Sequence, residues 1–129
     1  MTRLEAAPDL HGMRVLVVED MLMVAEMLAE ALTIAGVEVV GPVGRVEAAV
    51  LMAQREALDG ALLDVNLAGE SSGPVAAALH ARGIPFVFLT GYSDPAALPT
   101  AFREVPRLLK PFMEHELEAA MAARFRQPH

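Results

Sequence analysis

The fold is decided by the stretch Arg14-Val-Leu-Val-Val-Glu-Asp20, a short β-branched apolar run that stops abruptly at two acids. Continuous apolarity over so few residues is typical of a strand buried on both faces, as in a parallel sheet. Helical spacing of apolar residues follows from Met21 to Ala35 and stops at Gly36, a residue that favours the left-handed end of a helix. A strand followed by a helix is the repeating unit of an α/β sheet.

The same alternation continues to the end of the chain. Further strands are expected at residues 37–43 (interrupted by Gly41-Pro42), 61–64, 86–90 and 105–110. Further helices are expected at residues 46–57, 74–82 and 114–125, with a short or distorted one at 93–104. The last prediction reflects Pro99, which would break a helix interior. Residues 66–73 contain two Gly and two Ser and are expected to form a loop.

Five strands that alternate with five helices require right-handed crossovers and a parallel sheet covered on both faces. A chain of 129 residues is too short for a closed eight-unit barrel. The sequence therefore predicts an α/β fold, a flavodoxin-like (βα)5 doubly wound parallel sheet with strand order 2-1-3-4-5.

The first helix carries one narrow polar stripe and is otherwise apolar, so most of it is expected to be buried. Met21, Met23 and Met27 are interpreted mainly as core filler. Leu22 and Met23 flank the polar stripe and are expected to be half exposed.

Composition excludes several function classes. The chain has no Cys, which removes disulfides, thiolate metal sites and cysteine nucleophiles. A net charge of −7 argues against direct binding to nucleic acid or to an anionic membrane surface. No apolar run approaches the ~18 residues of a membrane span, and the first twelve residues lack the apolar core of a signal peptide. A cytoplasmic location is expected.

Polar side chains follow the predicted strands at their carboxyl ends, where α/β sheets bind ligands. These residues are Glu19, Asp20, Asp64, Thr90 and Lys110. In the expected strand order they converge on one patch. Taken singly, each has an ordinary alternative: Asp20 as a helix N-cap, Asp64 as a turn cap, Thr90 as a strand end and Lys110 as a solvated cation.

Three carboxylates about 4 Å apart repel by roughly 4 kcal/mol per pair at an effective dielectric near 20. One ammonium from Lys110 and one divalent cation would neutralise them. Ligands that are all oxygen suit Mg²⁺, and Mg²⁺ beside a carboxylate and a lysine suits phosphoryl transfer. Asp64 is the candidate nucleophile, with Thr90 and Lys110 contacting phosphoryl oxygens.

These residues stand in four motifs, which belong to a longer region of family resemblance from Arg14 to Phe125. The motifs are Val-Val-Glu19-Asp20, Leu-Leu-Asp64-Val-Asn66, Phe-Leu-Thr90-Gly-Tyr92 and Leu-Leu-Lys110-Pro111-Phe112. In this order and on these elements, they resemble the receiver domain of two-component response regulators.

The resemblance implies that Asp64 accepts a phosphoryl group from a phosphohistidine of a histidine kinase. Glu19, Asp20 and Asp64 would bind Mg²⁺ together with the backbone carbonyl of Asn66. Thr90 would couple phosphorylation to the surface around the fourth helix and fifth strand, which controls a downstream protein partner. Such a domain is a signalling phosphoacceptor rather than an enzyme: it takes phosphate from donors and slowly dephosphorylates itself.

On this basis residues 1–12 are expected to be a flexible arm, residues 13–126 the receiver domain, and residues 127–129 a frayed end. Leu22 and Met23 would form part of a docking face for the helical bundle of the kinase. The motifs also look like those of receivers associated with HWE-type histidine kinases. A single-domain regulator and a receiver excised from a hybrid kinase both stay open.

The sequence departs from the family pattern at Arg107, where an aromatic switch residue is usual. We therefore hypothesise that output relies on a change of local order in residues 91–106. Tyr92 either gates access to Asp64 or only covers it. The resemblance further implies a cis Lys110–Pro111 bond.

Three alternatives stay open at this point. One is a degenerate receiver that acts only as a protein-docking module, which would rest on Arg107. Another is a phosphohydrolase of the haloacid dehalogenase type, although Asn66 stands where that family has a second Asp. The third is a flavodoxin-like flavin binder, although Glu19 and Asp20 would repel its phosphate.

Overall fold

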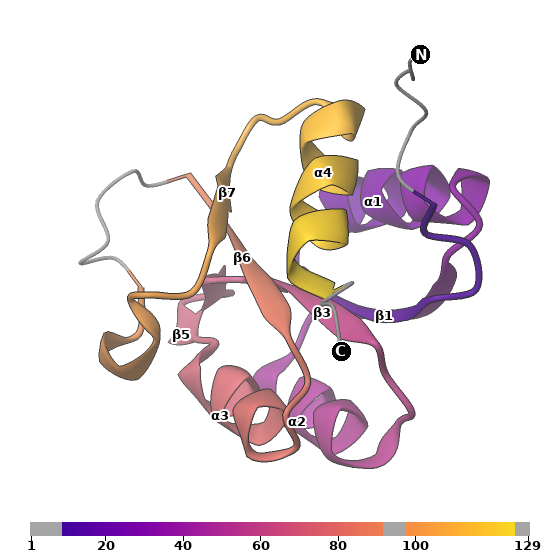
Figure 1. Ribbon diagram of the computed structural model, residues 1–129. Coiled ribbons are helices and arrows are strands. Elements are labelled where there is room, and N and C mark those ends of the chain that lie inside the picture. The colour runs from indigo at the N-terminus through magenta and orange to yellow at the C-terminus, as the bar shows by residue number, and fades with distance from the viewer. Residues whose placement is uncertain (1–8, 92–97, 126–129) are drawn as a thin grey trace.

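The computed structural model describes residues 9–91 and 98–125, and its centre is a five-stranded parallel sheet (Figure 1). In spatial order the strands are β2 (Glu38–Val43), β1 (Arg14–Val18), β3 (Gly60–Asp64), β6 (Phe86–Thr90) and β7 (Arg107–Leu109). Strands β4 (Asn66–Leu67) and β5 (Glu70–Ser71) belong to a separate hairpin. When the five strands of the main sheet are numbered in chain order, their spatial order is the predicted 2-1-3-4-5, so the doubly wound α/β fold is confirmed.

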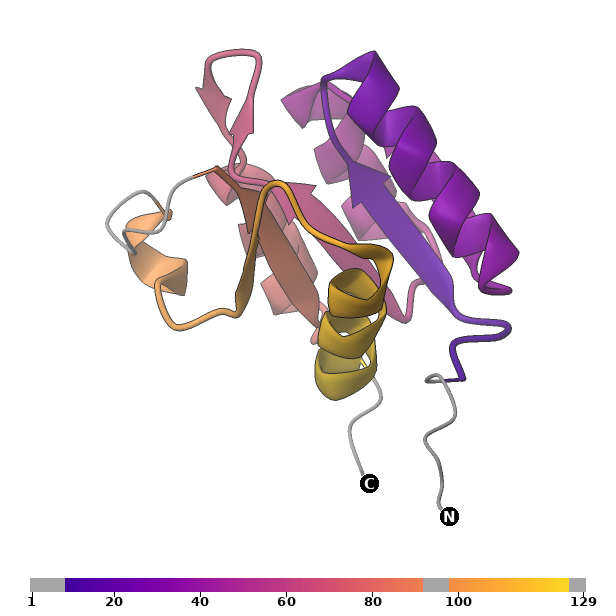
Figure 2. The same cartoon turned by 90° about the horizontal axis from the view of Figure 1, so that it is seen from above.

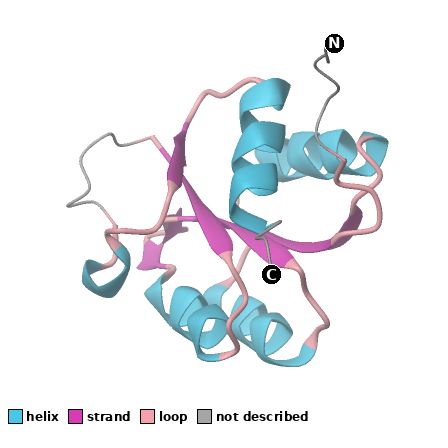
Figure 3. Ribbon diagram, in the orientation of Figure 1, coloured by secondary structure: helices cyan, strands magenta, loops and turns pink. Residues whose placement is uncertain are grey.

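In the described part of the chain, four α-helices cover the two faces of the sheet (Figures 1 and 3). One face carries α1 (Leu22–Ile34) and α4 (Glu114–Phe125), and the other carries α2 (Val46–Arg55) and α3 (Gly73–Ala81). Alternate side chains of β1 pack on opposite faces of the sheet. Val15 and Val17 pack with α1 and α4, whereas Leu16 and Val18 pack with α2 and α3. This period of two is why an uninterrupted apolar run was needed to form the strand.

Helix α1 is much less buried than its composition predicts. Its buried residues are Ala25, Leu28 and Leu32, the single stripe that a helix turns toward one sheet. The prediction that its methionines fill the core is wrong, because Met21, Met23 and Met27 are 58%, 76% and 67% exposed.

The segment between β6 and β7 was expected to hold a short or distorted helix. Its described part forms one 3-10 helix, η2 (Thr100–Phe102), which follows Pro99, in agreement with that expectation. Residues 92–97 lie outside the described part of the chain. The Phe102 ring meets the rings of Phe86 and His80 edge to face, with centroids 5.7 and 5.8 Å apart. The expected interruption at Gly41-Pro42 takes the form of an irregularity within β2. The strand continues to Val43, but its pairing with β1 shifts register between Val40 and Val43.

The predicted loop over residues 66–73 contains a small antiparallel hairpin. It consists of β4 (Asn66–Leu67) and β5 (Glu70–Ser71) and stands up from the sheet in Figure 2. Ala68 and Gly69 join the two strands with φ values of 53° and 88°, which is the pattern of a type I′ turn. An L-residue in this conformation carries strain of about 1–2 kcal/mol, so the turn at Ala68 requires support from its surroundings.

Packing extends into the segment expected to be a flexible arm, because Leu10 is only 1% exposed and lies in the core beneath α1. None of the helices described here combines the length and the apolar character that crossing a bilayer requires.

Candidate functional site

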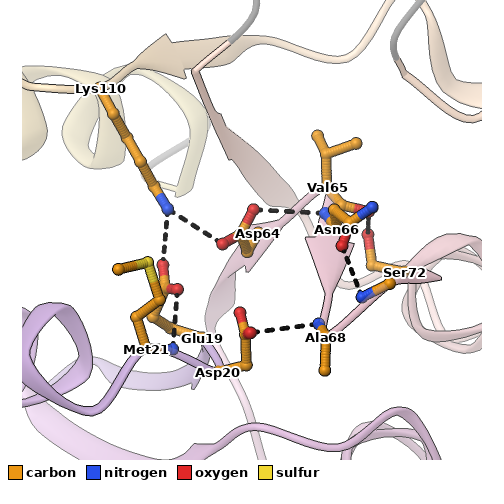
Figure 4. Close-up of polar contacts among 10 residues, drawn as sticks. Glu19, Asp20, Met21, Asp64, Val65, Asn66, Ala68, Ser72 and Lys110 are labelled. Atoms are coloured by element: carbon orange, nitrogen blue, oxygen red, sulfur yellow. Dashed lines mark hydrogen bonds and ion pairs between the residues drawn. The ribbon is translucent and has the colours of Figure 1, made fainter.

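Three carboxylates meet at the carboxyl ends of two neighbouring strands, β1 and β3 (Figure 4). Glu19 and Asp20 follow β1 directly, and Asp64 is the last residue of the neighbouring β3. Each offers one carboxylate oxygen to a cluster in which these atoms lie within 4.8 Å of one another. Glu19 and Asp64 are buried and Asp20 is exposed, so the cluster opens to solvent on the Asp20 side.

Lys110 reaches this cluster from the end of β7. Its Nζ atom lies 2.9 Å from Oε1 of Glu19 and 2.9 Å from Oδ2 of Asp64. Because β6 separates β3 from β7, the long side chain bridges one strand to make both contacts. The Lys110–Pro111 bond is cis, as the resemblance implied.

Burial and charge shift the pKa values of this cluster. Burial raises the pKa of Glu19 above its ordinary value, the hydrogen bond from Lys110 opposes this, and Asp64 adds to the rise. Burial alone would lower the pKa of Lys110, but the hydrogen bonds to Glu19 and Asp64 outweigh it and the net shift is upward. Lys110 therefore stays cationic, and one ammonium faces three acids.

Backbone N–H groups orient the two buried carboxylates. The N–H of Met21 donates to Oε2 of Glu19 at 3.2 Å, and the N–H of Asn66 donates to Oδ1 of Asp64 at 3.3 Å. In each buried acid, one carboxylate oxygen therefore accepts a hydrogen bond from Lys110 and the other accepts one from a backbone N–H. Their carboxylate planes are held from both sides before any ligand arrives.

Asp20 is held differently. Its Oδ2 atom accepts a hydrogen bond of 3.1 Å from the N–H of Ala68, at the tip of the β4–β5 hairpin. Helix α1 begins after Met21 with no side-chain cap, so Asp20 does not act as its N-cap. Sequence reasoning missed this contact, because the donor is a backbone group on an element it did not predict.

Thr90 ends β6 next to the cluster. It is buried and pairs with Leu109 of β7, while Asp64 on the other side pairs with Leu89. The Thr90 carbonyl accepts a hydrogen bond of 2.8 Å from the Lys110 N–H. Thr90 therefore lies on the strand between Asp64 and Lys110, at the same sheet edge.

The remaining sequence-predicted residues lie apart from this cluster or outside the described chain. Arg107 is half-buried on β7, where it pairs with Phe88 of β6. Leu22 and Met23 are exposed in the first turn of α1. Tyr92 lies outside the described residues.

The candidate ligands found among the described residues are all carboxylate oxygens, and a hard divalent cation prefers such ligands. The residues thus fit a metal ion, with Glu19, Asp20 and Asp64 as its candidate carboxylate ligands. The arrangement joins a buried carboxylate, an ammonium in contact with it and an exposed acid that together could hold a cation.

Comparison with known proteins assigns the family. Residues 15–122 match the response regulator receiver domain. The chain is 44% identical to SdrG from Sphingomonas melonis Fr1, over 86% of this chain and 94% of that one, with a TM-score of 0.76. It therefore belongs to the response regulator receiver domains, which serve two-component signalling.

Two further solved structures share this fold. The signal receiver domain of a modulated diguanylate cyclase from Desulfovibrio desulfuricans G20 is 30% identical, with a TM-score of 0.78 over 88% of this chain and 94% of that one. The receiver domain of the sensor histidine kinase PA1611 from Pseudomonas aeruginosa PAO1, which has a magnesium ion in its active site cleft, is 24% identical. Its TM-score is 0.75 over 90% of this chain and 99% of that one. Comparison with curated proteins gave no match.

Proposed function

We propose that this domain is a phosphoacceptor in which Asp64 takes a phosphoryl group from a phosphohistidine of a histidine kinase. The observation that carries the proposal is the paired contact of Lys110 Nζ with Glu19 and Asp64, 2.9 Å each, beside three clustered acids. A structural ion pair needs one acid. Three acids around one ammonium leave an uncompensated negative charge that suits a second cation.

The transfer is a displacement at phosphorus. A carboxylate oxygen of Asp64 forms the new P–O bond while the P–N bond to the histidine breaks, and the departing imidazole keeps the electron pair and takes up a proton. Lys110 keeps Asp64 oriented and then pairs with the negative phosphoryl group, which gains charge-assisted contacts in the transition state. Thr90, one strand away, is placed to donate a hydroxyl hydrogen bond to a phosphoryl oxygen.

Mg²⁺ is the proposed cofactor, held by Glu19, Asp20, Asp64 and the backbone carbonyl of Asn66. When bound, it would offset the charge of the acids and of the phosphoryl oxygens. The magnesium-containing cleft of the PA1611 receiver domain supports this choice over other hard cations.

Docking of the kinase is proposed at the exposed apolar start of α1. Leu22 and Met23 are 71% and 76% exposed, and a hollow of about 320 Å³ continues from this helix to α4, lined in part by Met27, Ile34 and Phe112. Exposed apolar residues around a concave surface are typical of protein contact sites. Output is proposed to arise in residues 91–106 and in β7, the strand that pairs with Thr90 through Leu109.

Incubation of the protein with Mg²⁺ and acetyl phosphate tests the phosphoacceptor proposal. Intact mass spectrometry should show the gain of one phosphoryl group, and peptide mass mapping should place it on the peptide that contains Asp64. Chelation of Mg²⁺ with EDTA should suppress the gain. A protein that takes up no phosphoryl group, or takes it up on another residue, would overturn the proposal.

Thermal unfolding tests the cofactor separately. Mg²⁺ binds the folded cluster but not the unfolded chain, so at a hundredfold excess over Kd it should stabilise the protein by about 2.7 kcal/mol. The melting temperature should then rise by several degrees. Asp20→Asn removes one ligand and should lessen that rise. Equal responses of the two proteins would contradict the ligand assignment.

A further inference from the structure

The β4–β5 hairpin contacts two of the three acids, although it spans only six residues. At its base the N–H of Asn66 donates to Asp64, and at its tip the N–H of Ala68 donates to Asp20, at 3.3 and 3.1 Å. The two donors are separated by one residue, Leu67, whose side chain is only 1% exposed and anchors the hairpin in the core. The hairpin therefore connects the two acids through a short, anchored piece of backbone (Figure 4).

The base of the hairpin is fixed, whereas its tip is not packed. Ser72, which follows β5, is fully buried, and both its N–H and its hydroxyl donate to the carbonyl of Val65 at 3.0 Å. At the tip Ala68, Gly69 and Glu70 are exposed. A hollow of about 280 Å³ separates this tip from the start of α2. Two hydrogen bonds hold the tip: the Gly69 N–H donates to Oδ1 of Asn66 within the hairpin at 2.9 Å, and the Ala68 N–H donates to Asp20. The second is the contact through which the hairpin reaches Asp20.

Asp20 also depends on this contact. It is the exposed acid of the cluster, and Lys110 contacts the other two acids. The Ala68 N–H fixes one oxygen of Asp20 and so selects the direction of the other. Groups that hold a metal ligand in this way typically alter metal affinity by 10–100-fold when they are lost.

We propose that the β4–β5 hairpin is a clasp that positions Asp20 for Mg²⁺, so that the turn Ala68–Gly69 sets the affinity of this domain for the ion. Ala68 acts here as a positioning residue through its backbone N–H. The inference rests on the proposed Mg²⁺ site and adds to it a determinant that lies outside the ligands. Since coupling is reciprocal, bound Mg²⁺ should in turn hold the hairpin tip in place.

Two substitutions at residue 68 distinguish the effect of losing the backbone N–H donor from the effect of changing the side chain. Ala68→Pro removes the N–H and cannot adopt the φ of 53°, because proline is fixed near −65°. Ala68→Gly keeps the N–H and adopts positive φ freely. Isothermal titration of MgCl₂ into each protein should show binding weakened about tenfold or more by Ala68→Pro, and affinity equal to or tighter than wild type for Ala68→Gly.

A matched pair of glycines controls for general loss of stability. Gly69 and Gly12 have φ values of 88° and 85°, and a Cβ atom at either would meet nothing within 4 Å. Gly12 precedes β1, at the sheet end opposite the acids. Substitution to Ala therefore imposes similar backbone strain at both, and should lower the melting temperature of the Mg²⁺-free proteins similarly. Gly69→Ala should weaken Mg²⁺ binding several-fold or more, and Gly12→Ala by less than about twofold.

Wild-type Mg²⁺ affinity in Ala68→Pro would overturn the clasp, as would equal affinities of Gly69→Ala and Gly12→Ala. Either result would leave the Mg²⁺ site itself intact, since the wild type still binds. A wild-type protein that gives no binding heat and no thermal shift with Mg²⁺ would instead remove the site, and the clasp with it.

Discussion

Asp64→Asn should take up no phosphoryl group under conditions in which the wild-type protein gains one. The substitution retains the size and shape of the side chain but replaces a negative carboxylate oxygen with an amide oxygen, which is a poor nucleophile. Lys110 would still pair with Glu19, as it does at 2.9 Å, so the pocket should stay assembled. Intact mass spectrometry after incubation with Mg²⁺ and acetyl phosphate measures the result directly.

Asp59→Asn is the matched control for this experiment. It makes the same chemical change at an exposed acid just before β3. The Asp59 carboxylate accepts a hydrogen bond of 2.8 Å from the backbone N–H of Arg14. It lies at the amino end of the strand that Asp64 ends, so its phosphorylation should match that of the wild type. Labelling of Asp64→Asn at the wild-type rate would mean that another residue accepts the group, and the assignment of Asp64 as the phosphoacceptor would then be wrong.

The sheet could be predicted from the sequence because its signal is local and repeated. Strands β3 and β6 are short runs in which every residue is buried, and such runs are typical of a parallel sheet that is covered on both faces. Once the strand order was fixed, the convergence of Glu19, Asp64 and Lys110 followed from topology, because parallel strands end at one edge.

Burial of α1 could not be predicted in the same way. Its apolar residues surround the helix, and composition alone does not say how much of that surface meets the sheet. Only the stripe through Leu28 and Leu32 does so, and Met23 and Met27 stay outside. This apolar surface without a covering element in the described chain is consistent with the proposed docking face.

The hairpin was missed for another physical reason. Strands of two residues leave no periodicity to detect, and the turn uses Ala-Gly where Asn-Gly is the usual signal for a type I′ turn. Its contact with Asp20 joins residues 48 positions apart through a backbone N–H, which no side-chain pattern records. Sequence reasoning therefore found the acids but not the element that orients one of them.

Lys110→Met should separate metal binding from phosphoryl transfer. Methionine keeps much of the length of the side chain but removes the ammonium that contacts Glu19 and Asp64. The three acids then face Mg²⁺ without a competing cation, so Mg²⁺ affinity should stay equal or become tighter. The initial rate of phosphorylation by acetyl phosphate should fall by about 10²–10³, the usual loss when one fixed donor to a developing anion is removed.

The same variant should change how stability depends on pH in the absence of Mg²⁺. The pKa of Glu19 is already raised in the folded protein, mainly by burial, so the folded state binds protons more readily than the unfolded chain. This group therefore favours folding below its unfolded pKa, and the contribution is lost as pH rises through its folded pKa. Without Lys110 that folded pKa should rise further, and Lys110→Met should regain stability relative to wild type as pH is lowered.

Lys110→Arg provides the control, since it keeps the charge but replaces a compact ammonium with a planar guanidinium. It should preserve the wild-type dependence of stability on pH and still slow phosphorylation, because the two contacts of 2.9 Å converge on one nitrogen atom. Melting temperatures across a pH series, with and without Mg²⁺, distinguish the two variants. If Lys110→Met is phosphorylated as fast as wild type, then Lys110 only neutralises the acids, and its assigned part in the transfer is wrong.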